Sequence, residues 1–228
     1  MKGTAVIENK TMGLLKSQRS YTAEEYLAME RKSKRRHQYL DGDIFAMAGE
    51  SWNHAVISSN VARSLGNQLE NKPCHTVSKD TKVRSGPFLR GANKSSGLFS
   101  YPDIVIVCDE PEFYDDATDV VLNPKVIVEV LSPATEKFDR GEKFHRYQTY
   151  NPTLTDYLLV SQDKAQIEQY TRKSNGTWSY EIHSGMNATI NIRSIGCRVK
   201  MKDVYARIKF KPKKRLKPDS VFGEDEVD

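Results

Sequence analysis

The segment that decides the fold reads PKVIVEVLSP and covers residues 124–133. Five of the six residues from Val126 to Leu131 are aliphatic, and the sixth is Glu129. A short apolar run of this kind predicts a strand that is buried on both faces. An isolated ionised carboxylate in such a strand costs several kcal/mol, so we expect Glu129 to be paired, protonated or bound to a metal.

A second apolar strand is predicted upstream, where residues 102–109 read PDIVIVCD. It begins at Asp103, directly after a proline. In the later strand, alternation places Glu129 on the same face as Ile127 and Leu131. If the two strands are neighbours in one sheet, Asp103 and Glu129 can meet at one edge. Two carboxylates on rigid strands favour Mg²⁺ or Mn²⁺, which prefer carboxylate, carbonyl and water ligands.

Helix and turn signals organise the rest of the chain. Thr22 and Glu25 have the spacing of a capping box, which predicts a helix that ends near Lys32. The Asp41-Gly42 pair predicts a β-hairpin, because both residues tolerate a positive φ. Further predictions are a helix from Ser51 to about Asn71, a strand over 74–84, a loop over 85–100, a helix over 135–150, and strands thereafter.

The length of 228 residues suits one domain. We expect it to span residues 21–210, as an α/β fold with a central mixed sheet flanked by helices and an N-terminal helix and hairpin. Residues 1–20 show no clear period and are expected to form a flexible lead-in. Residues 211–228 change from basic to acidic and are expected to be disordered.

The cysteines and the apolar runs bear on location. Cys74, Cys108 and Cys197 are odd in number and widely separated, so we expect reduced thiols rather than a disulfide framework or a zinc site. No run reaches the roughly 20 apolar residues that cross a bilayer. The N-terminus also lacks the apolar core of a signal peptide. The sequence therefore predicts a soluble, cytoplasmic protein with no membrane partner.

The charge permits a polyanionic partner without requiring one. The net charge is +5 and the pI is about 8.9. Basic runs lie at residues 31–37 and 211–217, and a solvated surface is their simplest explanation.

Two longer segments carry a family resemblance. Residues 101–111, YPDIVIVCDEP, and residues 122–147, LNPKVIVEVLSPATEKFDRGEKFHRY, resemble the PD-(D/E)XK nuclease superfamily. More narrowly, they resemble a bacterial family of putative restriction endonucleases that was long catalogued as a domain of unknown function. The resemblance extends over about residues 21–210. It implies a restriction-endonuclease-like core with a divalent metal at one sheet edge.

The resemblance also implies a catalytic set. Asp103 matches the aspartate of the Pro-Asp element, and Glu129 matches the acidic residue of the E-x-K element. Together with the carbonyl of Val130, they would hold Mg²⁺, or alternatively Mn²⁺. The implied reaction is metal-assisted hydrolysis of a phosphodiester.

Two positions depart from the superfamily pattern. Leu131 occupies the usual lysine position, and Lys143 in the following helix matches the lysine that the narrower family uses instead. Alternatively, Lys143 only pairs with Asp139 on a helix surface. Gln38 stands where the family commonly has a metal-binding glutamate, which puts the activity in doubt.

The remaining candidates are supporting residues. The resemblance suggests a base or substrate-binding role for His54, although a histidine at a helix start is often structural. Asp80 would support the site or lie in an exposed turn. Asp139 and Arg140 would orient groups or contact phosphate. The candidates for contacts with the DNA backbone are Lys79, Lys82 and Arg84.

Three functions remain open at this level. The first is a metal-dependent DNA endonuclease, for which a two-fold dimer would suit cleavage of both strands. The second is a nucleic-acid-binding protein on a degenerate nuclease scaffold, which Gln38 favours. The third is a metal-dependent hydrolase of small phosphoesters.

Overall fold

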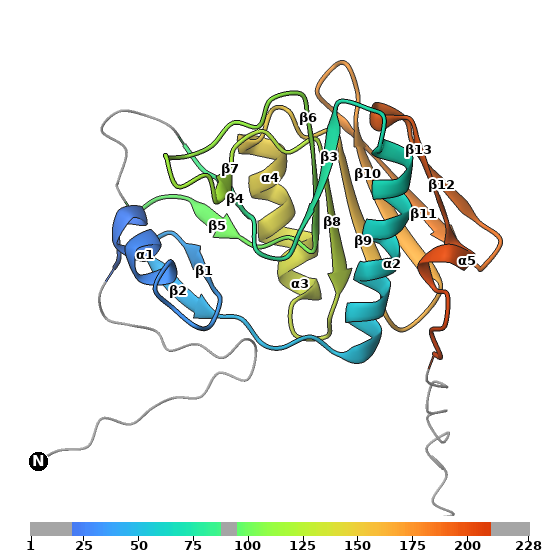
Figure 1. The fold of residues 1–228 in the computed structure, drawn as a ribbon, viewed down its shortest axis with the longest axis horizontal. Helices are drawn as coiled ribbons and strands as arrows, with labels where there is room; N and C mark the ends of the chain where they lie inside the picture. The colour runs from blue at the N-terminus through green and yellow to red at the C-terminus, as the bar shows by residue number, and fades with distance from the viewer. Residues whose placement is uncertain (1–19, 88–94, 211–228) are drawn as a thin grey trace, which may run out of the picture.

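The buried segment around Glu129 forms the centre of a six-stranded sheet. In a computed structural model that describes residues 20–87 and 95–210, it is strand β8 (Val126–Leu131), and all six of its residues are buried. The sheet order is β11-β10-β9-β8-β6-β3 (Figure 1). Only the β8–β9 pair is parallel among these strands, so the sheet is mixed. The other strands are β3 (Cys74–Ser78), β6 (Ile104–Cys108), β9 (Asp156–Ser161), β10 (Gln166–Arg172) and β11 (Trp178–Ser184).

A second sheet lies beside the first and carries the N-terminal hairpin (Figure 1). Its order is β2-β1-β5-β4-β7, and β4 pairs with β7 in parallel. The strands are β1 (His37–Leu40), β2 (Asp43–Ala46), β4 (Lys82–Ser85), β5 (Leu98–Ser100) and β7 (Val120–Val121). The hairpin turns at Asp41 and Gly42, whose φ angles are 47° and 96°, as the sequence predicted.

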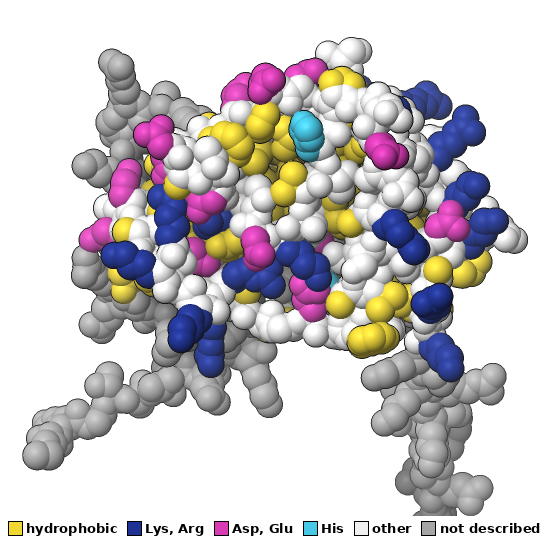
Figure 2. All heavy atoms as spheres, viewed as in Figure 1, with side chains coloured by type: hydrophobic (Ala, Val, Ile, Leu, Met, Phe, Trp, Pro, Cys, Tyr) yellow, Lys and Arg dark blue, Asp and Glu magenta, His cyan; other side chains and the backbone are white. Residues whose placement is uncertain are grey.

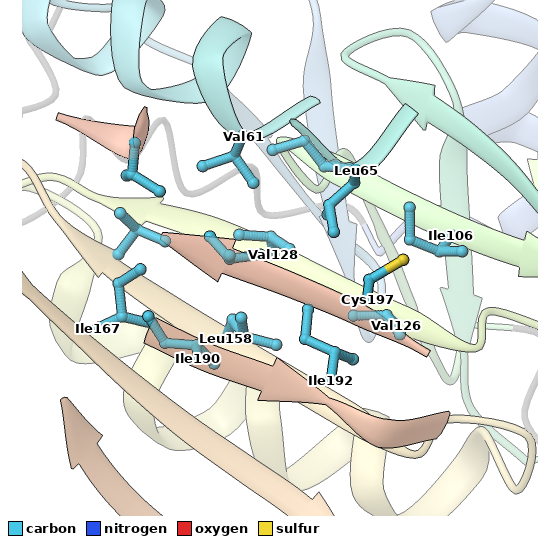
Figure 3. Packing of buried hydrophobic residues seen from close by; sticks show 14 of the residues in the cluster. Val61, Leu65, Ile106, Val126, Val128, Leu158, Ile167, Ile190, Ile192 and Cys197 are labelled. Atoms are coloured by element: carbon cyan, nitrogen blue, oxygen red, sulfur yellow. The ribbon is translucent and has the colours of Figure 1, made fainter. Parts of the chain in front are cut away.

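Helix α2 (Trp52–Leu69) covers one face of the six-stranded sheet. Its stripe of Ile57, Val61, Leu65 and Leu69 packs on alternate residues of β8 and on the ribbon of β12 (Thr189–Ile192) and β13 (Cys197–Lys200) (Figure 3). The short helix α5 (Met201–Val204) closes this layer. Fully burying each aliphatic side chain contributes about 1.5–3 kcal/mol, so the two-sided burial of β8 holds the strand firmly.

The opposite face of β8 packs against a helical segment that changes type along its length. This segment consists of α3 (Glu136–Phe138), a π-helix over Asp139–Lys143, and α4 (Phe144–Tyr150). The sequence predicts one continuous helix over 135–150 here. The π-helical stretch contains Gly141 and is wider than an α-helix, so it shifts the direction of the side chains that follow.

Helix α1 (Ala23–Glu30) packs on the hairpin at the far end of the molecule (Figure 1). Thr22 accepts a hydrogen bond from the N–H of Glu25, and the Glu25 carboxylate accepts one from the N–H of Thr22. The predicted capping box is therefore confirmed.

Two predictions about strands and one about cysteines are wrong. Residues 74–84 form two strands in different sheets, because the chain turns at Lys79, where φ is 66°. The predicted loop over 85–100 contains β5. Cys74 and Cys108 form a disulfide, because β3 and β6 are neighbours and their register places the two residues opposite each other. Cys197 is a buried free thiol.

The predicted lead-in over residues 1–20 and the predicted tail over residues 211–228 fall almost wholly outside the described residues. Among the helices that are described, none combines the length and the apolar character that spanning a membrane requires.

Candidate active site at the edge of the six-stranded sheet

Asp103 and Glu129 lie side by side, as the sequence predicted. The antiparallel register of β6 and β8 pairs Ile104 with Val128. Continuing this register by one residue places Asp103 beside Glu129. The backbone N–H of Val130 donates a 2.7 Å hydrogen bond to Asp103 Oδ2. This bond fixes the aspartate against the strand that carries the glutamate.

Glu129 shares its face of β8 with apolar residues and is only 4% exposed. Burial raises its pKa above the ordinary value, and the charge of Lys143 partly offsets that effect. Its Oε1 lies 2.7 Å from Lys143 Nζ, so the buried carboxylate has a cationic partner.

Lys143 occupies the end of the π-helix and is buried. Its Nζ also donates a 3.1 Å hydrogen bond to Asp139 Oδ1. Burial lowers the pKa of Lys143, but Asp139 and Glu129 raise it more, to well above its ordinary value. Lys143 pairs with Asp139, but it is buried rather than on the helix surface and it also contacts Glu129. Its catalytic role stays a prediction. Leu131 is buried in the apolar cluster, so the ammonium beside Glu129 comes from the helical segment instead.

The start of α2 adds a third group to this edge. Ser51 caps the helix by accepting a hydrogen bond from the N–H of His54. The Nε2 of His54 lies 3.3 Å from Asp103 Oδ2, and its Nδ1 lies 3.5 Å from Glu50 Oε2. Burial lowers the pKa of His54, but the hydrogen bond and charge of Asp103, with Glu50, raise it overall.

Glu50, His54 and Asp103 could together hold a metal ion. One ligand atom from each lies within 4.8 Å of the others. Glu50 is not among the site residues predicted from the sequence. The four-residue spacing of Glu50 and His54 on either side of a capping serine was the available signal, since residues with this spacing face one another at a helix start.

These groups line a cavity of about 410 Å³ between the two sheets. Gln38 also lines it, and Gln38 Oε1 is buried without a hydrogen-bond partner among the described residues. The lining consists of Arg36, Gln38, Phe45, Ala46, Met47, Ala48, Gly49, Glu50, Ser51, His54, Lys79, Tyr101, Pro102, Asp103, Glu129, Val130, Ser132, Pro133, Ala134, Thr135, Asp139, Lys143 and Gln162.

Two predicted supporting residues lie away from the cavity. The side chain of Asp80 is 93% exposed in the turn between β3 and β4, and its Oδ1 lies 3.8 Å from Arg36 Nη1. Arg140 pairs through Nη1 with Glu168, at 2.9 Å. Neither residue is among those that line the cavity.

Of the three candidates for DNA contacts, only Lys79 lines the cavity, where its Nζ pairs with Glu50 at 2.6 Å. Lys82 is buried and pairs with Asp119 at 2.7 Å. Arg84 is buried as well and donates to the carbonyls of Gly86 and Pro87. The structure therefore does not present Lys82 or Arg84 to a polymer outside the protein.

The mixed sheet with helices on both faces gives this protein the restriction-endonuclease-like fold. It belongs to the Uma2 family, described as "putative restriction endonuclease", whose profile matches residues 23–201.

Two relatives come from Synechocystis sp. The uncharacterized protein slr1290 is 34% identical over 82% of this chain and 92% of its own length. The uncharacterized protein sll1609 is 31% identical over 74% of this chain and 90% of its own length. The fold also matches the crystal structure of a putative nuclease belonging to DUF820 from Anabaena variabilis. That match has a TM-score of 0.64 at 14% identity and covers 81% of this chain and 97% of the other.

Proposed function

We propose that this protein is a divalent-metal-dependent endonuclease that hydrolyses phosphodiester bonds in DNA. The observation that carries the proposal is the buried ammonium of Lys143, 2.7 Å from a glutamate that lies beside Asp103 in a cavity. Purely structural packing does not require two carboxylates and a cation at the rim of a sheet, because apolar residues would be at least as stable there.

The donor set fits a small divalent cation. Asp103, Glu129 and the Val130 carbonyl would supply oxygen ligands, and His54 and Glu50 lie on the other side of Asp103. Carboxylate and carbonyl oxygens suit Mg²⁺ and Mn²⁺ alike, whereas imidazole favours Mn²⁺. When bound, such a cation would polarise the phosphate and lower the pKa of an attacking water.

The protein's own residues have separable roles in this proposal. Lys143 keeps its proton at neutral pH because its pKa is raised, so it acts on negative charge at the phosphate and not as a base. Asp139 holds the ammonium in place through the 3.1 Å hydrogen bond. The Val130 N–H and His54 orient Asp103 from two sides.

The test is incubation of the purified protein with supercoiled and linear DNA, with and without Mg²⁺ or Mn²⁺. We expect metal-dependent cleavage that disappears in Glu129→Gln. A matched control is Glu168→Gln, because Glu168 is also buried in this sheet but pairs with Arg140 away from the cavity. Cleavage that persists undiminished in Glu129→Gln would refute the assigned site.

A second candidate is a nucleic-acid-binding protein without strong catalysis. The observation that favours it is Gln38, whose amide oxygen lies in the cavity wall, has no hydrogen-bond partner within residues 20–87 and 95–210, and carries no charge to attract a metal. Binding without cleavage in the wild type, with cleavage in Gln38→Glu, would support this candidate over the first.

A further inference from the structure

The exposed side of the β12–β13 ribbon and of the segment that follows it carries an accumulation of positive charge. Figure 2 shows lysine and arginine side chains gathered toward the right-hand edge of this face, where β12, β13 and α5 lie in Figure 1. We call these residues the basic strip. It consists of Arg193, Arg198, Lys200, Lys202, Arg207 and Lys209, all of which are exposed.

The strip is built on a rigid support. In β13, Cys197 and Val199 point into the core while Arg198 and Lys200 point outward. Side chains two residues apart on one strand face are separated by roughly 6–7 Å. The ribbon thus holds Arg198 and Lys200 at a fixed spacing on its outer face.

Neighbouring side chains leave this charge uncompensated. The cross-strand partner of Arg198 is Asn191, and that of Lys200 is Thr189, so both partners are neutral. Asp203 is the one acidic residue between positions 191 and 210. Over residues 20–87 and 95–210, no ion pair joins a strip side chain to a carboxylate.

The basic run at residues 31–37 differs in this respect. Arg31 pairs with Asp115 at 2.8 Å and with Asp119 at 2.7 Å. His37 pairs with Glu30 at 2.8 Å. The nearby carboxylates therefore neutralise part of the run, although its basic residues are closer together in the sequence than those of the basic strip.

The strip runs along α2, from Gln68, whose side chain contacts the backbone of Arg198, to the start of the helix. Asn53 Nδ2 donates to the carbonyl of Lys209 at 3.5 Å. Further along the same helix, Asn60 Nδ2 donates to the carbonyls of Val204 and Ala206. One end of the strip therefore lies against the start of α2, next to His54, which lines the cavity.

We propose that the basic strip binds the phosphate backbone of duplex DNA and leads it to the cavity. The proposal rests on the proposed nuclease function and assigns the surface that holds the polymer. Lysine and arginine that contact phosphates release counterions, so binding through them weakens steeply as salt rises. This surface takes the role that sequence analysis gave to Lys82 and Arg84, which are buried.

The test measures binding alone, by fluorescence anisotropy of a labelled DNA duplex in EDTA over a series of salt concentrations. The strip variant combines Arg198→Gln, Lys200→Gln and Lys202→Gln. The control variant combines Lys32→Gln, Lys34→Gln and Arg35→Gln, which removes the same charge from exposed positions of the other run. Both variants change exposed side chains only, so their melting temperatures should match the wild type.

For the strip variant, we expect the plot of log association constant against log salt concentration to be less steep, with a slope smaller in magnitude by about 2–3. At 0.1 M salt, we expect this variant to bind the duplex at least about tenfold more weakly than the wild type. The control should change both quantities much less. An unchanged slope in the strip variant, or an equal loss in the control, would overturn the proposal. Binding is measured in EDTA, so it does not depend on metal or on cleavage. If the wild type binds DNA through the strip but does not cleave DNA when Mg²⁺ or Mn²⁺ is supplied, the nuclease proposal is refuted and this inference stands.

Discussion

Lys143 Nζ lies between two buried carboxylates, 2.7 Å from Glu129 Oε1 and 3.1 Å from Asp139 Oδ1. The three groups come from a central strand and from the π-helix that packs on it. Their arrangement links the stability of the fold to the chemistry of the site, because neither carboxylate is solvated enough to tolerate the loss of the ammonium.

Replacing Lys143 by methionine should therefore destabilise the protein by roughly 3–5 kcal/mol, as expected when one partner of a buried ion pair is removed. Urea unfolding measures this loss. Lys137→Met is the control, since Lys137 is exposed six residues earlier in the same helical segment and should change stability little. Cleavage should also fall by about 10²–10³-fold in material that remains folded, if Lys143 stabilises developing charge. Equal urea midpoints for the two variants would contradict the buried ion pair.

Gln38→Glu tests whether the neutral side chain at position 38 weakens metal binding in the cavity. A new carboxylate there is close to other acidic groups, so we expect the metal-free protein to melt at a lower temperature than the wild type. Added Mn²⁺ should raise the melting temperature of the variant more than that of the wild type, because a ligand stabilises the state it binds. Identical shifts in the two proteins would mean that position 38 does not contact the metal.

Asp119 makes stability depend on pH. Burial raises its pKa, but hydrogen bonds from Arg31 and Lys82 lower it more, from 3.8 to about 2. A depressed folded-state pKa contributes stability that is present above the unfolded value and is lost as the pH falls through the folded value. Asp119→Asn should therefore lower the unfolding free energy at pH 7, and the difference from the wild type should shrink between about pH 4 and pH 2. A difference that stays constant over this range would show that the charge of Asp119 does not stabilise the fold.

The Cys74–Cys108 disulfide should make stability sensitive to reductant. The two residues are separated by 34 positions, and a cross-link of that span is worth about 3–4 kcal/mol in the chain-entropy model. Dithiothreitol should lower the urea midpoint of the wild type. The variant with both Cys74→Ala and Cys108→Ala should not respond, since the remaining Cys197 has no partner within the chain. A wild-type midpoint that ignores dithiothreitol would argue against the bond in solution.

Local signals predicted much of the fold. The capping box at Thr22, the Asp41-Gly42 turn and the apolar stripe of α2 depend on neighbours in sequence, so the sequence alone was sufficient. The pairing of β6 with β8 was also predictable, because two strongly apolar strands need a shared buried sheet.

Predictions that depended on distant contacts failed. The strand breaks at Lys79, where φ is positive, and lysine is not a residue type that predicts a positive φ. Lys82 and Arg84 looked like exposed strand residues, but β4 lies inside a sheet between β5 and β7. The disulfide required the register of β3 on β6, and Glu50 became a candidate ligand only when α2 was placed beside Asp103.

The cavity lies on a seam between two sheets. Glu129 and Asp103 are tied to the six-stranded sheet, whereas Phe45 and Gln38 belong to the five-stranded sheet that carries the hairpin. A small change in the angle between the sheets would therefore widen or narrow the entrance and leave the spacing of the acidic pair unchanged. The two walls of the cavity therefore answer to different parts of the chain: a substitution in the hairpin changes one wall and leaves the acidic pair on the other.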